Sequence, residues 1–132
     1  MASNPALRPP ALTITPRDRR FGTDAVEPRL WHGGQVEATA IYNALSSTFP
    51  KGEAFFVESV RAFREGAPPQ LAADIKAFTT QEAIHSREHD RFNQRAQQAG
   101  YDLSKLESRV NERLAVGRAR PLAAQLAATM AL

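Results

Sequence analysis

The sequence predicts an all-α protein. From Gln35 onward, apolar residues recur at spacings of three and four, and runs of β-branched residues are few, which is typical of helices rather than strands. The chain has 132 residues, of which 42% are hydrophobic and 23% charged, as in an ordinary globular domain. Its length suits one domain rather than two. We find no convincing strand pattern or internal repeat, and we therefore expect a single helical core.

Five helices are expected, spanning residues 35–48, 51–65, 70–98, 103–116 and 121 to the end. Glycine and proline mark the breaks between them, at Pro50 and Gly52, at Gly66, Pro68 and Pro69, and at Gly100. Pro50 is expected to end the first helix because proline lacks a backbone donor and clashes with the preceding turn. Ser104 and Glu107 have the spacing of a capping box, which predicts the start of the fourth helix.

Residues 1–30 are expected to form an extended arm rich in proline and arginine, and residues 31–132 the helical domain. Five of the nine prolines lie before residue 29. Proline removes both the backbone donor and the conformational freedom that regular structure needs.

The composition excludes several classes of protein. The chain has no cysteine, which excludes disulfides, thiolate zinc sites and iron–sulfur clusters and fits a cytoplasmic location. The N-terminus lacks the apolar segment of a signal peptide, and no charge-free stretch approaches the ~20 residues of a membrane span. The net charge of +3 comes from basic residues interspersed with acidic ones, so neither nucleic-acid nor membrane binding is expected.

The helix predicted at 70–98 carries the most informative pattern. At ~100° per residue, one narrow stripe holds Leu71, Ile75, Phe78, Glu82, His85, His89, Asn93 and Ala96, and the opposite face, expected to be solvated, holds Lys76, Arg87, Glu88, Arg91, Gln94, Arg95 and Gln98. The stripe is apolar at its start, whereas its middle consists of the polar residues Glu82, His85 and His89. A buried carboxylate and buried imidazoles need partners, and a cation supplies them. The spacing Glu82-x-x-His85 is the pattern used in helix-bundle metal sites.

His89 lies one further turn along and has three candidate roles: a third ligand, a residue that orients a ligand, or the proton acceptor of a reaction. Without a metal, Glu82, His85 and His89 would form a hydrogen-bonded core network, or the stripe would turn to water at its far end. We favour the metal, because three ligand-type residues in register would otherwise require several further partners.

Glu53 lies on the preceding predicted helix and shares a face with Phe56, Val57 and Val60, so we expect it to point inward. A carboxylate in a first turn can simply complement the helix dipole. Together with an inward Glu-x-x-His, however, it makes half of a dimetal carboxylate site. We therefore predict that Glu53, Glu82, His85 and His89 bind divalent metal, as two ions of iron or manganese, or else zinc.

Four segments resemble the family of predicted metal-dependent hydrolases of bacteria: Trp31-His-Gly-Gly, Asn43 to Phe56, Val60-Arg-Ala-Phe-Arg, and Gln81-Glu-Ala-Ile-His-Ser-Arg-Glu-His. The resemblance covers about residues 18 to 132. It implies a ferritin-like helical bundle in which Glu53, Glu82 and His85 match the first half of the metal site. Members of this family usually continue past the point where this chain stops, with further helices that bring another carboxylate and another Glu/His combination.

Two expectations about assembly follow. The last predicted helix keeps its apolar spacing to Leu132 without a stop signal, so we expect the chain to be the N-terminal part of a longer domain. Alternatively, a homodimer would complete the bundle by pairing two half-sites across a two-fold axis. The sequence leaves open whether this chain is active on its own.

The resemblance implies a metal-dependent hydrolase acting on a small-molecule substrate, in which the metal activates water and a spare carboxylate or His89 takes the proton. The same ligands suit a di-iron or manganese oxidoreductase that activates O₂. A metal-free helical interaction module is the third hypothesis. Tyr42 and Asn43 are candidates to line the cavity, and His32 is expected to help order Trp31 on the core rather than to guard an entrance.

Overall fold

The computed structural model describes residues 13–22 and 27–132, and all regular secondary structure in these residues is helical. The four helices are α1 (Val36–Arg61), α2 (Pro69–Gln98), α3 (Ser104–Arg118) and α4 (Leu122–Ala131). The all-α prediction is therefore confirmed. No described helix is both long and apolar enough to cross a bilayer. The predicted arm is described only in part, because residues 1–12 and 23–26 lie outside the described residues.

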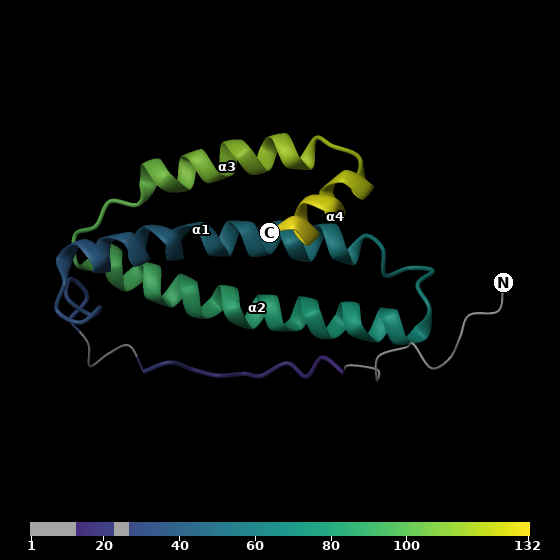
Figure 1. Cartoon of the computed structure of the whole chain (residues 1–132), viewed down its shortest axis with the longest axis horizontal. Helices are drawn as coiled ribbons and strands as arrows, with labels where there is room; N and C mark the ends of the chain where they lie inside the picture. Colours follow the sequence, from purple (N-terminus) through teal and green to yellow (C-terminus); the bar gives the residue numbers. More distant parts are fainter. Residues whose placement is uncertain (1–12, 23–26) are drawn as a thin grey trace.

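Helix α1 is central to the fold. It packs against each of the other three helices, whereas α2 packs against α1 alone among the helices. Figure 1 shows α1 and α2 side by side and antiparallel, with α3 along the other side of α1 and α4 turning back onto it. The interface between α1 and α2 is the place where the two predicted motif segments meet.

The prediction of a helix break at Pro50 is wrong, since α1 continues through Pro50 and Gly52. A proline inside a helix leaves the carbonyl four residues earlier without its usual donor, here that of Ser46. The structure supplies a replacement donor, because Nδ2 of Asn93 on α2 donates to the Ser46 carbonyl at 3.2 Å. The lost hydrogen bond within the helix is thus replaced by one between helices.

The buried residues are mostly small and polar. The buried hydrophobic residues are Phe55, Ile75, Ala96 and Leu103, and the buried polar or charged ones are Thr39, Asn43, Ser46, Ser47, Glu53, Ser59, Thr79, Asn93 and Gln125. Buried hydroxyls need partners; the Ser59 and Thr129 hydroxyls, for example, lie 2.7 Å apart and join α1 to α4. Polar pairs therefore fix the alignment of the helices alongside apolar contact.

Residues 13–22 run along α2 without regular structure (Figure 1). The backbone N–H of Arg17 donates to Gln81 at 2.8 Å, and that of Phe21 donates to Glu88 at 3.1 Å. Glu88 is consequently only 10% exposed. The expectation that this whole face of α2 is solvated is wrong at Glu88, because the preceding segment covers it.

The helix ends agree with the predicted signals in one place and differ in another. Gly100 follows α2 with a φ of 93°, a conformation that glycine adopts without strain. The capping box at Ser104 does not form, since α3 begins at Ser104 with Leu103 as its N-cap residue and without a side-chain cap hydrogen bond. Instead, Asp102 accepts the backbone N–H of Ser104 at 3.0 Å, so the capping acceptor lies two residues earlier than expected.

Candidate metal centre

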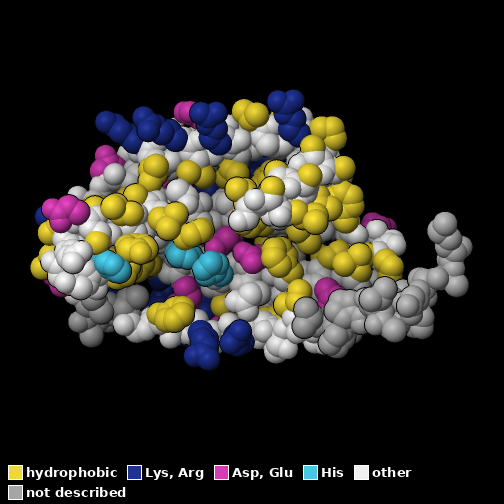
Figure 2. All heavy atoms as spheres, in the orientation of Figure 1, with side chains coloured by type: hydrophobic (Ala, Val, Ile, Leu, Met, Phe, Trp, Pro, Cys, Tyr) yellow, Lys and Arg dark blue, Asp and Glu magenta, His cyan; other side chains and the backbone are white. Residues whose placement is uncertain are grey.

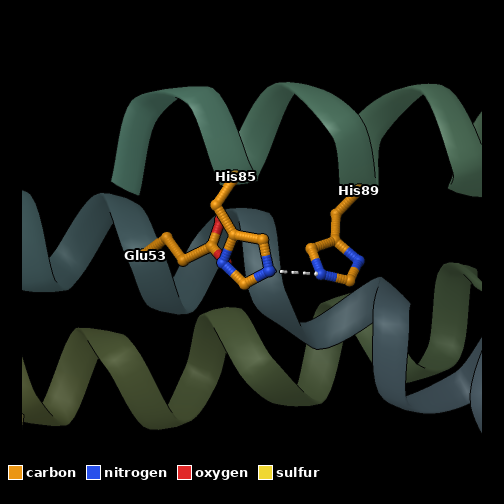
Figure 3. Close-up of side chains that lie close together, drawn as sticks. All are labelled: Glu53, His85 and His89. Carbon is orange, nitrogen blue, oxygen red and sulfur yellow. Dashed lines mark hydrogen bonds and ion pairs between the residues drawn. The ribbon is translucent and has the colours of Figure 1, made fainter. Parts of the chain in front are cut away.

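Glu53 of α1 and His85 and His89 of α2 form a compact cluster, with one potential ligand atom from each within 4.8 Å of the others (Figure 3). His85 Nδ1 lies 2.7 Å from Glu53 Oε1, and His85 Nε2 lies 3.0 Å from His89 Nε2. The structure therefore brings together three of the four residues predicted as metal ligands.

The helices place these side chains by simple periodicity. His85 and His89 are four residues apart, so they share one face of α2. Glu53 meets them from α1 and is 2% exposed. His85 is half exposed, and histidine side chains reach the surface beside acidic and hydrophobic ones in Figure 2. The cluster is thus buried on the Glu53 side and open to solvent at His85.

Ser46 is a member of the site that sequence reasoning missed. Its hydroxyl lies 2.8 Å from His89 Nδ1. The available signal was the spacing of seven residues between Ser46 and Glu53, which places both on the same face of α1 two turns apart. A serine in a helix carries no chemical signal of its own, so this partnership emerges only once α1 and α2 are packed together.

The two imidazoles are arranged as metal ligands usually are. A histidine ligand generally has its second ring nitrogen held by a polar partner, and here Nδ1 of His85 faces Glu53 while Nδ1 of His89 faces Ser46. Two nitrogens bound to one ion at about 2.1 Å lie about 2.9–3.4 Å apart, and the Nε2 atoms are 3.0 Å apart. Glu53 can therefore serve as a direct ligand or as the carboxylate that orients His85.

The metal-free alternative, a chain of hydrogen bonds from Ser46 through both imidazoles to Glu53, leaves the carboxylate poorly satisfied. Both oxygens of Glu53 are buried, and the donors beside them, His85 Nδ1 at 2.7 Å and the Ser86 hydroxyl, are not in good hydrogen-bond geometry. A buried carboxylate with poorly aligned donors is costly. The carboxylate oxygens and imidazole nitrogens of the cluster are together a suitable set of ligands for a divalent cation.

Burial changes the protonation of the cluster. It raises the pKa of Glu53 to about 7, helped by the charges of Glu82 and Asp90 and offset in part by the Ser86 hydroxyl. It lowers the pKa of His89 to about 4, with a smaller contribution from His85. The neutral imidazole is the form that binds metal. A pKa near 4 favours the ligand role of His89, and its role as proton acceptor stays a prediction.

Glu82 lies beside the cluster and is not one of its three members. With Glu53, Asp90 and other residues it lines a cavity of about 490 Å³, here called the acidic cavity. Burial raises the pKa of Glu82, and His85 counteracts this increase. Its role as a metal ligand stays a prediction.

A second cavity of about 350 Å³, here called the aromatic cavity, lies on the histidine side of the cluster. It is lined by Phe21, Trp31, Tyr42, Leu45, Ser46, Phe49, His85, Glu88, His89, Arg91 and Phe92. Tyr42 lines it as expected, whereas Asn43 is buried and accepts a hydrogen bond from Trp31 Nε1 at 3.0 Å. The His32 ring packs edge-on against Trp31, at 5.5 Å between centroids, in agreement with its expected ordering role.

Comparison with known families identifies the protein. A family model described as "predicted metal-dependent hydrolase" matches residues 15–132, nearly the whole chain. The chain belongs to this family. The match confirms the resemblance seen in the sequence motifs and, with the Glu53–His85–His89 cluster, supports a divalent metal. Searches of curated proteins and of solved structures found no match.

Proposed function

We propose that this member of the family is a hydrolase in which Glu53, His85 and His89 hold a divalent cation, with Glu82 as a further carboxylate beside it. The observation that carries the proposal is the Glu53 carboxylate. It is 2% exposed and lacks hydrogen-bond partners on both oxygens, yet it lies 2.7 Å from one of two converging imidazoles. A cation would compensate the carboxylate charge that the fold leaves poorly satisfied.

The residues have distinct roles in this proposal. A bound divalent cation would polarise a carbonyl or phosphoryl oxygen and lower the pKa of a bound water. His89 presents Nε2 with its Nδ1 held by the Ser46 hydroxyl, and His85 has Nδ1 beside the Glu53 carboxylate and Nε2 beside His89. A proton acceptor works best with a pKa near the working pH. His89, with a pKa of about 4, falls below this range, so the spare carboxylate beside the cluster, Glu82, is the proposed proton acceptor.

The number and identity of the ions are also proposals. Imidazole and carboxylate donors suit iron or manganese, and also zinc. A second ion would use Glu82, which shares the acidic cavity with Glu53 and Asp90. Three ligands are half of the set in a ferritin-like dimetal bundle, which favours a larger assembly.

A homodimer that completes the bundle is the proposed assembly. Apolar side chains are left uncovered on α4, such as Leu122 at 53% and Met130 at 80% exposed. Exposed apolar residues of this kind mark surfaces that associate, and a two-fold axis would bring two clusters together. Light scattering of the metal-loaded protein tests this, and a mass of one chain would contradict it.

The proposed function is tested by metal analysis and hydrolysis together. Protein purified without chelator should contain iron, manganese or zinc, and metal-loaded protein should cleave members of a panel of esters, amides and phosphoesters. His85→Ala should lose both properties. His32→Ala is the matched control, because His32 lies outside the cluster, and it should keep both.

Other outcomes separate the alternatives. Hydrolysis that persists in metal-free protein would contradict the metal's role. Oxygen uptake by the iron-loaded protein, without cleavage of any substrate, would favour the oxidoreductase. A protein that binds no divalent metal at all would favour the helical interaction module.

A further inference from the structure

The aromatic cavity has walls from three parts of the chain. Helix α1 contributes Tyr42, Leu45 and Phe49, α2 contributes the two clustered histidines and Phe92, and the segments before α1 contribute Phe21 and Trp31. The two imidazoles of the Glu53–His85–His89 cluster are therefore also part of this wall. A group held in the cavity lies directly beside the proposed reaction centre.

The rings of the wall are packed against one another. Trp31 and Phe92 meet edge-on at 5.0 Å between centroids, and Phe49 lies 4.5 Å from the ring of His89. Trp31 is also held by its hydrogen bond to the buried Asn43. Aromatic walls of this kind bind flat apolar groups, because binding buries apolar surface area and forms contacts between rings. The cavity thus has a largely preformed shape.

Its volume sets the size of the occupant. An apolar cavity of about 150 Å³ holds benzene, and pockets for small molecules begin at about 300 Å³. At about 350 Å³, the aromatic cavity accommodates one substituted aromatic ring.

The charges in the wall are already paired. Among the described residues of this cavity, Glu88 and Arg91 carry permanent charges, and they lie 3.3 Å apart. Glu88 also contacts Arg87 at 2.8 Å and accepts the backbone N–H of Phe21. A charged ligand group would lose its hydration here without gaining a free counter-charge. The cavity therefore selects uncharged groups.

We propose that the aromatic cavity binds an uncharged aromatic group of the substrate and so positions the scissile bond beside His85 and His89. The positioning of a scissile bond rests on the proposed hydrolase function. Binding of the aromatic group is independent of that function, because the cavity walls are present without a metal.

Trp31 provides the test, since it is the only tryptophan of the chain and lines the cavity. Its fluorescence is titrated with 4-nitrobenzyl alcohol, which is neutral, and with 4-nitrobenzoate, which has a similar size and a negative charge. Quenching is measured relative to free N-acetyltryptophanamide. The alcohol should saturate the metal-free protein with a Kd at least tenfold lower than the benzoate.

Two matched variants locate the binding. Leu45→Asp puts a short, unpaired carboxylate in the cavity wall, and Ile41→Asp makes the same change one turn away on α1. Both side chains are exposed, but Ile41 does not line the cavity. Affinity for the alcohol should fall at least tenfold in the first variant and stay within twofold in the second. Circular dichroism confirms that both are folded.

Equal affinity for the neutral and charged probes, or equal effects of the two variants, would overturn the inference. Saturable binding of the alcohol to protein that hydrolyses nothing would uphold the inference while the proposed function fails. Metal-dependent hydrolysis without saturable quenching of Trp31 would uphold the function and overturn the inference.

Discussion

The two cavities beside the Glu53–His85–His89 cluster differ in the chemistry of their walls. The acidic cavity is lined by the carboxylates of Glu53, Glu82 and Asp90 and also by Arg87 and Arg91, whereas five aromatic rings line the other. Glu53 belongs to the first wall and the two imidazoles to the second. Three side chains thus form the boundary between a charged, polar region and a region suited to an organic group.

This separation explains why the cluster is electrostatically unusual. Carboxylates that face one another in a partly buried space resist ionisation, and the charge of Glu82 is the largest contribution to the raised pKa of Glu53 after burial itself. On the aromatic side, burial keeps His89 neutral. A cation bound between the two would relieve the first effect and would use the neutral imidazole that the second provides. The following changes test each side separately.

The largest effect is expected from Glu53→Gln, which keeps the shape of the side chain and removes its charge. Divalent metal affinity, measured by isothermal titration calorimetry, should fall by about 100-fold or more, since ligands and the groups that orient them typically contribute 10–100-fold each. Glu58→Gln is the control on the same helix, because Glu58 is exposed and pairs with Arg118. Equal affinities in the two variants would remove Glu53 from the site.

The next largest effect is expected from pH. The carboxyl of Glu53 has a raised pKa of about 7, so it binds a proton below that pH, and a metal ion must displace this proton. Affinity should therefore fall by about 30-fold or more between pH 8 and 5.5. His89, with a pKa of about 4, stays neutral over this range. Calorimetry in buffers of different ionisation enthalpy should detect proton release near pH 6, and a pH-independent affinity would contradict the assignment.

Glu82→Gln is expected to have a smaller effect, about tenfold on metal affinity, if Glu82 acts as a neighbouring charge. The same variant should shift the pH midpoint of metal binding downward, because removing this charge lowers the pKa of Glu53. A loss as large as that of Glu53→Gln would instead support Glu82 as a direct ligand. Asp90→Asn, which removes another charge from the same cavity, serves as the comparison.

The smallest effect is expected from changing the aromatic side. Leu45→Asp should leave metal affinity within about twofold of the unmodified protein, because Leu45 lies in the aromatic wall rather than in the Glu53–His85–His89 cluster. A large change in metal affinity would show that the two cavities are not independent.

Periodicity was sufficient to predict much of the site. The turn-by-turn spacing of His85 and His89 and the inward direction of Glu53 follow from 3.6 residues per turn, and the structure places these three side chains together. Local pattern could not predict the partners. Ser46 reaches His89 from another helix, and the segment that covers Glu88 lies 67 residues away in sequence.

Pro50 shows most clearly why a local rule failed. The rule that proline ends a helix concerns a missing donor, and the replacement donor, Asn93, lies 47 residues from Ser46 in the sequence. Such compensation depends on tertiary contact, which a pattern along one helix does not contain. The same holds for the aromatic cavity, whose walls come from three separate parts of the chain.

The hydrogen bond from Asn93 to the Ser46 carbonyl also sets how far α2 can slide along α1. A helix carbonyl normally has its donor within its own helix and offers a neighbouring helix no fixed point of attachment; Pro50 frees one carbonyl, and a single amide on α2 engages it. Sliding α2 by one turn, about 5.4 Å, would break this bond and carry His85 away from Glu53. Pro50 thus helps to fix the register of the two helices in which Glu53 of α1 lies beside His85 of α2.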